Sequence, residues 1–222
     1  MAHAIRMTDR FADARRNMIE RQLVARGITD PTVLAAMARV PREAFIPPEL
    51  ANSAYEDSPL PIAEGQTISQ PYIVALMAEA ACIRQPSRVL EVGTGSGYAA
   101  AVLAELARAV VTIERHAKLA SAARATLKRL GYSNVVVIEG DGSRGVPEQA
   151  PFDAILVAAG APSPPESLKR QLAEGGRLVI PISVNTHQDL RAITRSGDSF
   201  REEDLGPVRF VPLLGKEGWE ED

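Results

Sequence analysis

Three acidic residues lie at or just after the ends of apolar runs that predict buried strands: Glu91, Glu114 and Asp141. Glu91 stands two residues before a glycine-rich loop at 93–97, and Gly142 directly follows Asp141. In an open parallel sheet, ligands bind beyond the carboxyl ends of the strands. Three carboxylates at that edge, without a cluster of basic residues, favour a cationic ligand that carries no phosphate group.

The glycine loop lets the backbone approach a ligand closely and turn into a helix. The dinucleotide fingerprint would require glycine or alanine at the position of Tyr98, so a nicotinamide cofactor is disfavoured. A glycine turn or a strand-end acid on its own is often only structural. Here the order and spacing resemble the first motif of class I S-adenosylmethionine methyltransferases. That resemblance implies S-adenosyl-L-methionine as cofactor and S-adenosyl-L-homocysteine as product.

A longer match begins at Gly140-Asp141-Gly142 and continues through Ala150-Pro151-Phe152-Asp153 to Ile155. It resembles the corresponding pattern of protein-L-isoaspartate (D-aspartate) O-methyltransferases. The family resemblance covers the chain from about Met18 to Leu214 and includes the Val-Pro-Arg-x-x-Phe-Ile run at 40–46. It implies methylation of the free carboxylate of L-isoaspartyl residues in age-damaged proteins and peptides. The ester would then begin repair through a succinimide.

The resemblance also implies roles for individual residues. A Thr-Ile-Ser-x-Pro segment carries the active-site serine of the family and makes Ser69 the expected catalytic residue, which orients the substrate carboxylate. The expected cofactor-binding residues are Thr67, Ile68, Glu91, Gly93, Thr94, Gly95, Gly97, Glu114, Arg115, Asp141 and Gly142. We expect Glu91 at the methionine amino group, Glu114 at the ribose, and Asp141 with Gly142 at the adenine.

Physical chemistry alone leaves the role of Thr67 and Ser69 open. Pro71 is expected to begin a helix that runs to about Ala81, with Gln70 at its cap. The two hydroxyls then either bind a carboxylate at the helix N-terminus or only organise the turn. Some family members carry histidines at 70–74, where this chain has none, so a cofactor contact by those histidines does not carry over.

The proposed chemistry needs no general base, because a carboxylate with a pKa of about 4 is already ionised at neutral pH. No Gly-x-Ser-x-Gly elbow is present, which agrees with a serine that orients the substrate and is not a nucleophile. The main tasks are in-line positioning and exclusion of water.

From Ser87 onward, apolar strands alternate with helices. The expected strands are Arg88 to Val92, Val110 to Glu114, Val135 to Glu139, Ala154 to Ala158 and Arg177 to Ile182. The expected helices are Tyr98 to Ala107, Lys118 to Leu130 and Glu166 to Leu172. This alternation predicts an α/β fold with a mostly parallel, doubly wound sheet, and a strand–turn–strand pattern after Asp189 predicts an antiparallel C-terminal edge. The resemblance refines this to the Rossmann-like class I methyltransferase fold.

Three regions are expected along the chain. Residues 1–62 form a helical and irregular segment packed on the core, in which Gly27 ends one helix and Asp30 with Pro31 begins another. Residues 63–215 form the methyltransferase domain. Residues 216–222 form an acidic tail that is mobile unless Trp219 fixes it.

Composition limits the possible partners of the 222-residue chain. Its net charge of −3 argues against a dedicated nucleic-acid binder, and no apolar stretch approaches the roughly 20 residues of a membrane span. The basic N-terminus lacks the apolar segment of a secretory signal. A single cysteine, Cys82, excludes an intrachain disulfide and a cysteine-based zinc site, and three scattered histidines predict no metal site. We therefore expect a cytoplasmic, monomeric enzyme.

Two other functions remain open. The nearest alternative is a methyltransferase of the same fold that acts on another carboxylate acceptor, since the cofactor motifs would be the same. The other is a non-catalytic binding module, which the three intact strand-end acids disfavour. Nucleic-acid methylation is disfavoured by the charge and by the lack of an Asn/Asp-Pro-Pro-Tyr/Phe motif after the fourth strand.

Overall fold

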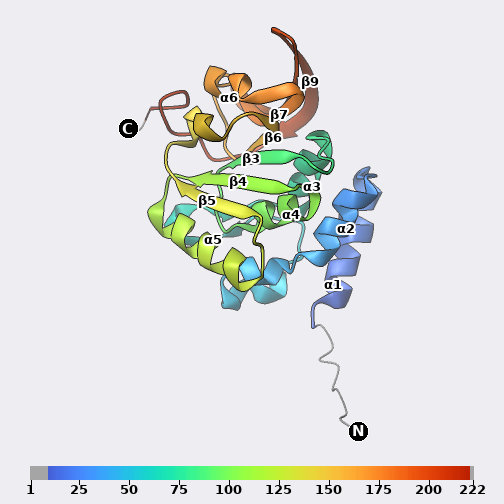
Figure 1. Ribbon diagram of the computed structural model, residues 1–222. Helices are drawn as coiled ribbons and strands as arrows, with labels where there is room; N and C mark the ends of the chain where they lie inside the picture. Colours follow the sequence, from blue (N-terminus) through green and yellow to red (C-terminus); the bar gives the residue numbers. More distant parts are fainter. Residues whose placement is uncertain (1–9, 221–222) are drawn as a thin grey trace.

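The computed structural model describes residues 10–220, and a seven-stranded sheet in the order β5-β4-β3-β6-β7-β8-β9 forms its centre (Figure 1). The strands are β3 (Arg88–Val92), β4 (Ala109–Glu114), β5 (Val135–Glu139), β6 (Phe152–Val157), β7 (Leu172–Val184), β8 (His187–Ser196) and β9 (Ser199–Val208). The strands from β5 to β7 in this order are parallel, and β8 and β9 continue the sheet in antiparallel pairs. This confirms the predicted α/β fold with an antiparallel C-terminal edge.

Successive residues of the central strands contribute to two hydrophobic clusters on opposite faces of the sheet. Val89 belongs to one cluster and Leu90 to the other, because side chains alternate along a strand. The first face is covered by α2 (Pro31–Arg39), α3 (Pro71–Ala80), α4 (Tyr98–Leu106) and α5 (Ala117–Arg129). The second face is covered by the short α6 (Glu166–Arg170) and by Leu213 of the C-terminal segment.

The sheet order places the topological switch point between β3 and β6. The chain proceeds from β3 through β4 to β5 on one side, and then returns to the other side of β3 with β6. Loops at the carboxyl ends of two adjacent strands therefore diverge there and leave room for a ligand. The predicted cofactor residues Glu91, Gly93 and Glu114 lie at this edge of the sheet.

The N-terminal segment packs against α3 and α4 (Figure 1). Its first helix, α1 (Ala12–Asn17), widens into a π-helical turn at Met18–Leu23 and tightens into a 3₁₀ turn at Val24–Arg26. Gly27 then adopts a φ of +94°, which confirms the predicted end of the helix at this residue. Residues 1–9 of the expected segment and residues 221–222 of the expected tail lie outside the described part of the chain.

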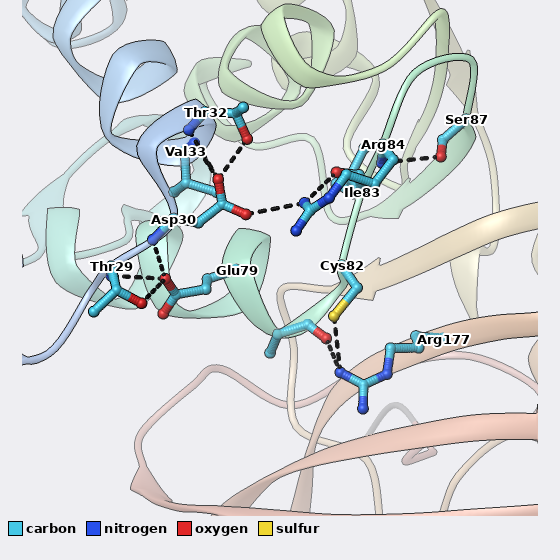
Figure 2. Close-up of polar contacts among 11 residues, drawn as sticks. Thr29, Asp30, Thr32, Val33, Glu79, Cys82, Ile83, Arg84, Ser87 and Arg177 are labelled. Atoms are coloured by element: carbon cyan, nitrogen blue, oxygen red, sulfur yellow. Dashed lines mark hydrogen bonds and ion pairs between the residues drawn. The ribbon is translucent and has the colours of Figure 1, made fainter.

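A polar network joins α2, α3 and the approach to β3 (Figure 2). The Asp30 carboxylate accepts hydrogen bonds from the amides of Thr32 and Val33, as predicted for the N-cap of α2, and forms an ion pair with Arg84 at 2.9 Å. Glu79 on α3 accepts from the amides of Thr29 (2.8 Å) and Asp30 (2.6 Å). The network therefore fixes the start of α2 to the domain that contains the sheet.

The predicted bounds of the elements agree with the structure to within one or two residues, except for β7. β7 is longer at both ends than the expected strand, because it pairs with β6 and β8. α6 ends at Arg170, before the expected Leu172, since Leu172 already belongs to β7. Gln70 is the N-cap residue of α3, as predicted, but its side chain makes no capping hydrogen bond and instead donates to the carbonyl of Asp57 at 3.0 Å.

Candidate functional site

A cavity of about 1100 Å³ lies at the carboxyl ends of β3 and β4. Three parts of the chain form most of its lining: the segment 66–74, the loops that follow β3, β4, β5 and β6, and the C-terminal run 205–214. Ser69 therefore shares one cavity with Gly93, Glu114 and Gly142. The structure brings together the predicted catalytic serine and part of the predicted cofactor site.

The glycines of the loop have different tasks. Gly93, with a φ of +93°, faces the cavity, and a Cβ there would lie 3.4 Å from Cβ of Ala158. Gly97, with a φ of +90°, packs the loop onto α5, where a Cβ would meet Ala123 and Leu127 at 3.3–3.4 Å. Gly97 is not among the cavity-lining residues. Gly93 thus lines the cavity, whereas Gly97 belongs to the packing behind it.

Glu114 ends β4 and lines the cavity. It is only 5% exposed, and each carboxylate oxygen accepts one hydrogen bond from a backbone amide. Oε2 accepts from Gly95 at 2.9 Å, and Oε1 accepts from His116 at 3.0 Å. An ionised oxygen has further lone pairs. The two amides therefore fix the carboxylate while leaving it able to accept hydrogen bonds from ligand hydroxyls.

Glu91 lies beneath the glycine loop and is 2% exposed. Burial raises the pKa of Glu91 to about 8, and the negative charge of Glu114 adds to this increase. The hydroxyl of Thr112, which donates to Oε2 at 2.5 Å, acts in the opposite direction. The Thr112 hydroxyl also lies 2.6 Å from that of Thr94, which is buried as well. Within residues 10–220, Oε1 of Glu91 has no hydrogen-bond partner. An unsatisfied buried carboxyl oxygen is unusual and favours a nearby positive group.

Asp141 follows β5 and lines a second cavity of about 940 Å³, together with Arg115 and the C-terminal residues 214–216 and 218–220. Its Oδ1 accepts from the amide and the hydroxyl of Ser143, and its Oδ2 from the amide of Lys216 at 3.0 Å. Gly142 is tightly enclosed, since a Cβ there would lie 2.5 Å from Cγ1 of Val92. The C-terminal segment therefore lies against the predicted adenine site.

The segment before α3 forms the other side of the first cavity. Thr67 and Ile68 make up the short strand β2 (Thr67–Ile68), which pairs with β1 (Leu60–Pro61). Ser69 follows, and within residues 10–220 its hydroxyl has no protein hydrogen-bond partner. This pairing orients the segment so that Thr67, Ile68 and Ser69 all line the cavity.

The residues present fit a compact cationic cofactor. Two buried carboxyl groups, Glu91 and Glu114, lie at adjacent strand ends, and one oxygen of Glu91 is unsatisfied. Glycine at 93 keeps side-chain atoms away from the place where a ligand would lie against the backbone. Thr94 and Gly95 support the site from behind, the first through Thr112 and the second through Glu114.

Several cavity residues were not predicted from the sequence. Tyr72, Ser96 and His116 line the first cavity, and only the fold brings these separate segments together. Val208–Leu213, from the end of the predicted C-terminal hairpin onward, form its opposite wall. The aspartate of the Ala-Pro-Phe-Asp motif, Asp153, lies away from the cavity and accepts from the amide of Arg88 at 2.6 Å.

The C-terminal segment is fixed as far as residue 219. The indole Nε1 of Trp219 donates to the carbonyl of Gly160 at 3.0 Å, and the Trp219 amide donates to Leu213 O at 2.7 Å. Glu217 accepts from the amide of Ser167 at 3.0 Å. Of the two possibilities for the acidic tail, the structure shows the one in which Trp219 holds it.

Comparison with known proteins identifies the family. The profile of the protein-L-isoaspartate(D-aspartate) O-methyltransferase family matches residues 13–218. A protein-L-isoaspartate O-methyltransferase of Rhodopseudomonas palustris is 59% identical over 206 residues, which are 92% of this chain and 94% of that protein. Protein-L-isoaspartate O-methyltransferase 2 of Marinobacter nauticus is 60% identical over 94% of this chain and 96% of its own length.

Solved structures agree with the sequence relatives. A protein-L-isoaspartate O-methyltransferase superposes with a TM-score of 0.82 and 32% identity, covering 92% of this chain and 67% of that chain. A putative enzyme of the same name from Plasmodium falciparum, solved in complex with S-adenosyl-L-homocysteine, gives a TM-score of 0.79 and 31% identity over 90% of this chain and 98% of its own. The chain belongs to the protein-L-isoaspartate(D-aspartate) O-methyltransferase family.

Proposed function

We propose that this protein transfers a methyl group from S-adenosyl-L-methionine to the free carboxylate of L-isoaspartyl residues in damaged proteins and peptides. The observation that carries this proposal is the single cavity that contains both Ser69 and the strand-end carboxylate Glu114. Relatives at about 60% identity bear the name of this activity over almost their whole length.

The cofactor roles are assigned to residues that line the two cavities and to Glu91 and Gly95, which lie behind the lining. Glu114 accepts hydrogen bonds from the ribose hydroxyls, and Gly93 and Gly95 place the backbone along the methionine part. The positive amino group of the cofactor favours the ionised form of Glu91, whose pKa is raised in the free protein, and Glu91 then serves as its counter-ion. Asp141, Gly142 and Arg115 surround the adenine, while Thr67 and Ile68 close the cofactor from the opposite wall. When bound, S-adenosylmethionine supplies a methyl group on a positively charged sulfur.

Ser69 orients the substrate. Its hydroxyl donates a hydrogen bond to one oxygen of the isoaspartyl carboxylate and leaves the other oxygen directed at the methyl group. The carboxylate is already ionised, so no residue of the chain has to remove a proton. The ester then closes without the enzyme: the next backbone nitrogen attacks the ester carbonyl, methanol leaves, and hydrolysis of the succinimide returns some normal aspartate.

The test is transfer of labelled methyl to matched peptides that carry isoaspartate or aspartate at one position. We expect base-labile labelling of the isoaspartyl peptide only. Ser69→Ala should lower kcat/KM for this peptide by about ten- to a hundredfold, as expected when an orienting hydrogen bond to a charged group is lost, with little change in cofactor Kd. Equal loss of both would give Ser69 a role in the cofactor site or the fold.

One alternative is kept: a carboxyl methyltransferase of the same fold with another acceptor. Cofactor binding without labelling of either peptide would favour it. Loss of cofactor binding altogether would contradict both functions.

We further propose a monomeric, cytoplasmic protein that does not bind nucleic acid, divided as 1–62, 63–215 and 216–222. Among residues 10–220, only four large apolar side chains are well exposed, which supports the monomer: Val24, Val136, Val211 and Trp219. The single cysteine supports the cytoplasmic location, and the net charge of −3 supports the absence of nucleic-acid binding. Between residues 10 and 220, no helix has the length and apolar character to cross a membrane.

A further inference from the structure

Asp141 and Gly142 form an Asp-Gly pair inside the predicted adenine site. Aspartate followed by glycine rearranges readily, because glycine leaves its backbone nitrogen unhindered and flexible. In that reaction the Gly142 nitrogen bonds to Cγ of the protonated Asp141 side chain, and the carboxyl hydroxyl leaves as water with the amide proton. Water then opens the succinimide, mainly to isoaspartate. The chain thus carries a dipeptide prone to this damage at its predicted cofactor site.

This position cannot avoid the hazard by changing Gly142. A Cβ on Gly142 would lie 2.5 Å from Cγ1 of Val92 and 3.3 Å from Cγ2 of Ile113, so a larger residue would displace the core beneath the site. Protection of Asp141 must therefore come from contacts of its carboxylate.

Both oxygens of Asp141 are held. Ser143 donates to Oδ1 from its amide (2.9 Å) and its hydroxyl (2.7 Å), and the amide of Lys216 donates to Oδ2 at 3.0 Å. The Ser143 hydroxyl is itself fixed by the amide of Glu217 at 3.0 Å. The close approach needs glycine at 215, since a Cβ there would lie 2.1 Å from Oδ1 of Asp141.

The C-terminal segment is anchored independently of Asp141. Glu217 accepts from Ser167 on α6, and Trp219 donates to the carbonyl of Gly160. The segment therefore holds the aspartate from a position that is fixed at two other points.

We propose that the C-terminal segment Gly215–Trp219 protects Asp141 from cyclisation and so keeps the enzyme from acquiring isoaspartate in its own cofactor site. The hydrogen bonds keep Cγ from swinging over the Gly142 nitrogen. They also keep the carboxylate ionised, a form that resists attack: burial alone raises the pKa of Asp141, but the bonds from Lys216 and Ser143 outweigh it and hold the pKa below its usual value. The protection does not depend on which acceptor the enzyme methylates.

The test compares Lys216→Pro, which removes the donating amide, with Lys216→Ala, which keeps it. A third variant ends at Leu214 and lacks the segment. The wild-type protein and each variant are incubated without cofactor at physiological temperature and pH. Trypsin then releases the peptide 130–144, in which Asp141 is the only aspartate, and its isoaspartyl form is quantified by chromatography and mass spectrometry. The free synthetic peptide 130–144 gives the unprotected rate.

We expect slow rearrangement in the wild type and in Lys216→Ala, and a rate about ten- to a hundredfold higher in Lys216→Pro, as expected for loss of one hydrogen bond to a charged group. The chain that ends at Leu214 should approach the rate of the free peptide. Fluorescence of Trp219, the only tryptophan, reports whether Lys216→Pro releases the segment. Asp198, which lies in an exposed hairpin turn and in its own tryptic peptide 196–201, is the internal reference and should age alike in all samples.

Two results would overturn the proposal. One is a wild-type rate at Asp141 equal to that of the free peptide. The other is an unchanged rate in both Lys216→Pro and the chain that ends at Leu214. An increase in the shortened chain alone would support protection by the segment as a whole.

Discussion

At the scale of single residues, the two buried acids of the site differ in how they are compensated. Glu114 accepts two backbone amides, whereas Glu91 has one hydroxyl donor and an oxygen without a partner in the described chain. A buried carboxyl group with so little compensation favours its neutral form. Ionising Glu91 in the free protein therefore costs free energy, and a positive ligand group next to it would lower this cost.

This difference predicts a pH-dependent stability. The pKa of Glu91 is raised from 4.5 to about 8, so the folded protein binds more protons than the unfolded chain between these values. Its contribution to stability is present below pH 4.5 and is lost as the pH rises toward 8, by at most about 1.4 kcal/mol per pH unit. Glu91→Gln should remove this dependence and be more stable than the wild type above pH 8, as measured by denaturant unfolding across pH. The control is Glu139→Gln, because Glu139 also ends a strand but is exposed. If the stability of Glu91→Gln changed with pH in the same way as that of the wild type, the prediction would be contradicted.

The residue types of the site were predictable, but their environments were not. Sequence spacing identified Glu91, Glu114 and Asp141 at strand ends, because buried runs and glycine turns are local signals. It could not predict that Asp141 is bound by the amide of Lys216, seventy-five residues later. Nor did it predict that Arg42 is fully buried, with its guanidinium 4.7 Å from the ring of Tyr98.

At the scale of elements, α2 connects the N-terminal segment to the sheet domain through the network in Figure 2. Hydrogen bonds from Thr32 and Val33 and the charge of Arg84 outweigh burial and lower the pKa of Asp30. The carboxylate thus combines a helix cap with an ion pair to the loop before β3.

Asp30→Ala should lower the free energy of unfolding by about 1–2 kcal/mol, since it removes an N-cap. Asp30→Asn keeps a capping oxygen but loses the ion pair with Arg84, which is largely exposed, so it should cost less than about 1 kcal/mol. Both are measured by urea unfolding at neutral pH. Equal losses in the two variants would show that the ion pair, and not the cap, holds α2.

Local signals also explain which elements were predicted correctly. β3 and β5 have the predicted bounds, and α3 begins at Pro71, because apolar runs, prolines and glycines act over a few residues. The order of the strands and the extension of β7 depend on pairing between distant segments, which periodicity does not encode. The π-helical turn at Met18–Leu23 also has no signal in the sequence that we could identify.

At the scale of the whole molecule, segments far apart in the sequence contribute to the larger cavity. The segment 66–74 forms one wall and the run 205–214, from the end of β9 onward, forms the other, with the sheet edge between them. Arg26, Arg115 and Arg209 line this cavity, and Glu114 is its only acidic lining residue among the described residues. Arg26 is already paired with Asp57 at 2.8 Å, while Arg209 is exposed and forms no ion pair within residues 10–220.

This distribution of charge predicts a preference for acidic residues beside the isoaspartate. A cation at the rim of a site steers and holds substrates of opposite charge. Arg209→Glu should therefore lower kcat/KM for an isoaspartyl peptide with acidic neighbours by about three- to tenfold, an effect weakened by salt, and change a neutral peptide much less. Arg201→Glu makes the same charge change on β9 outside the cavity and should leave both peptides unaffected. If the two variants lose activity equally, net charge and not the rim of the cavity sets the preference; if neither does, the acidic part of the substrate lies elsewhere.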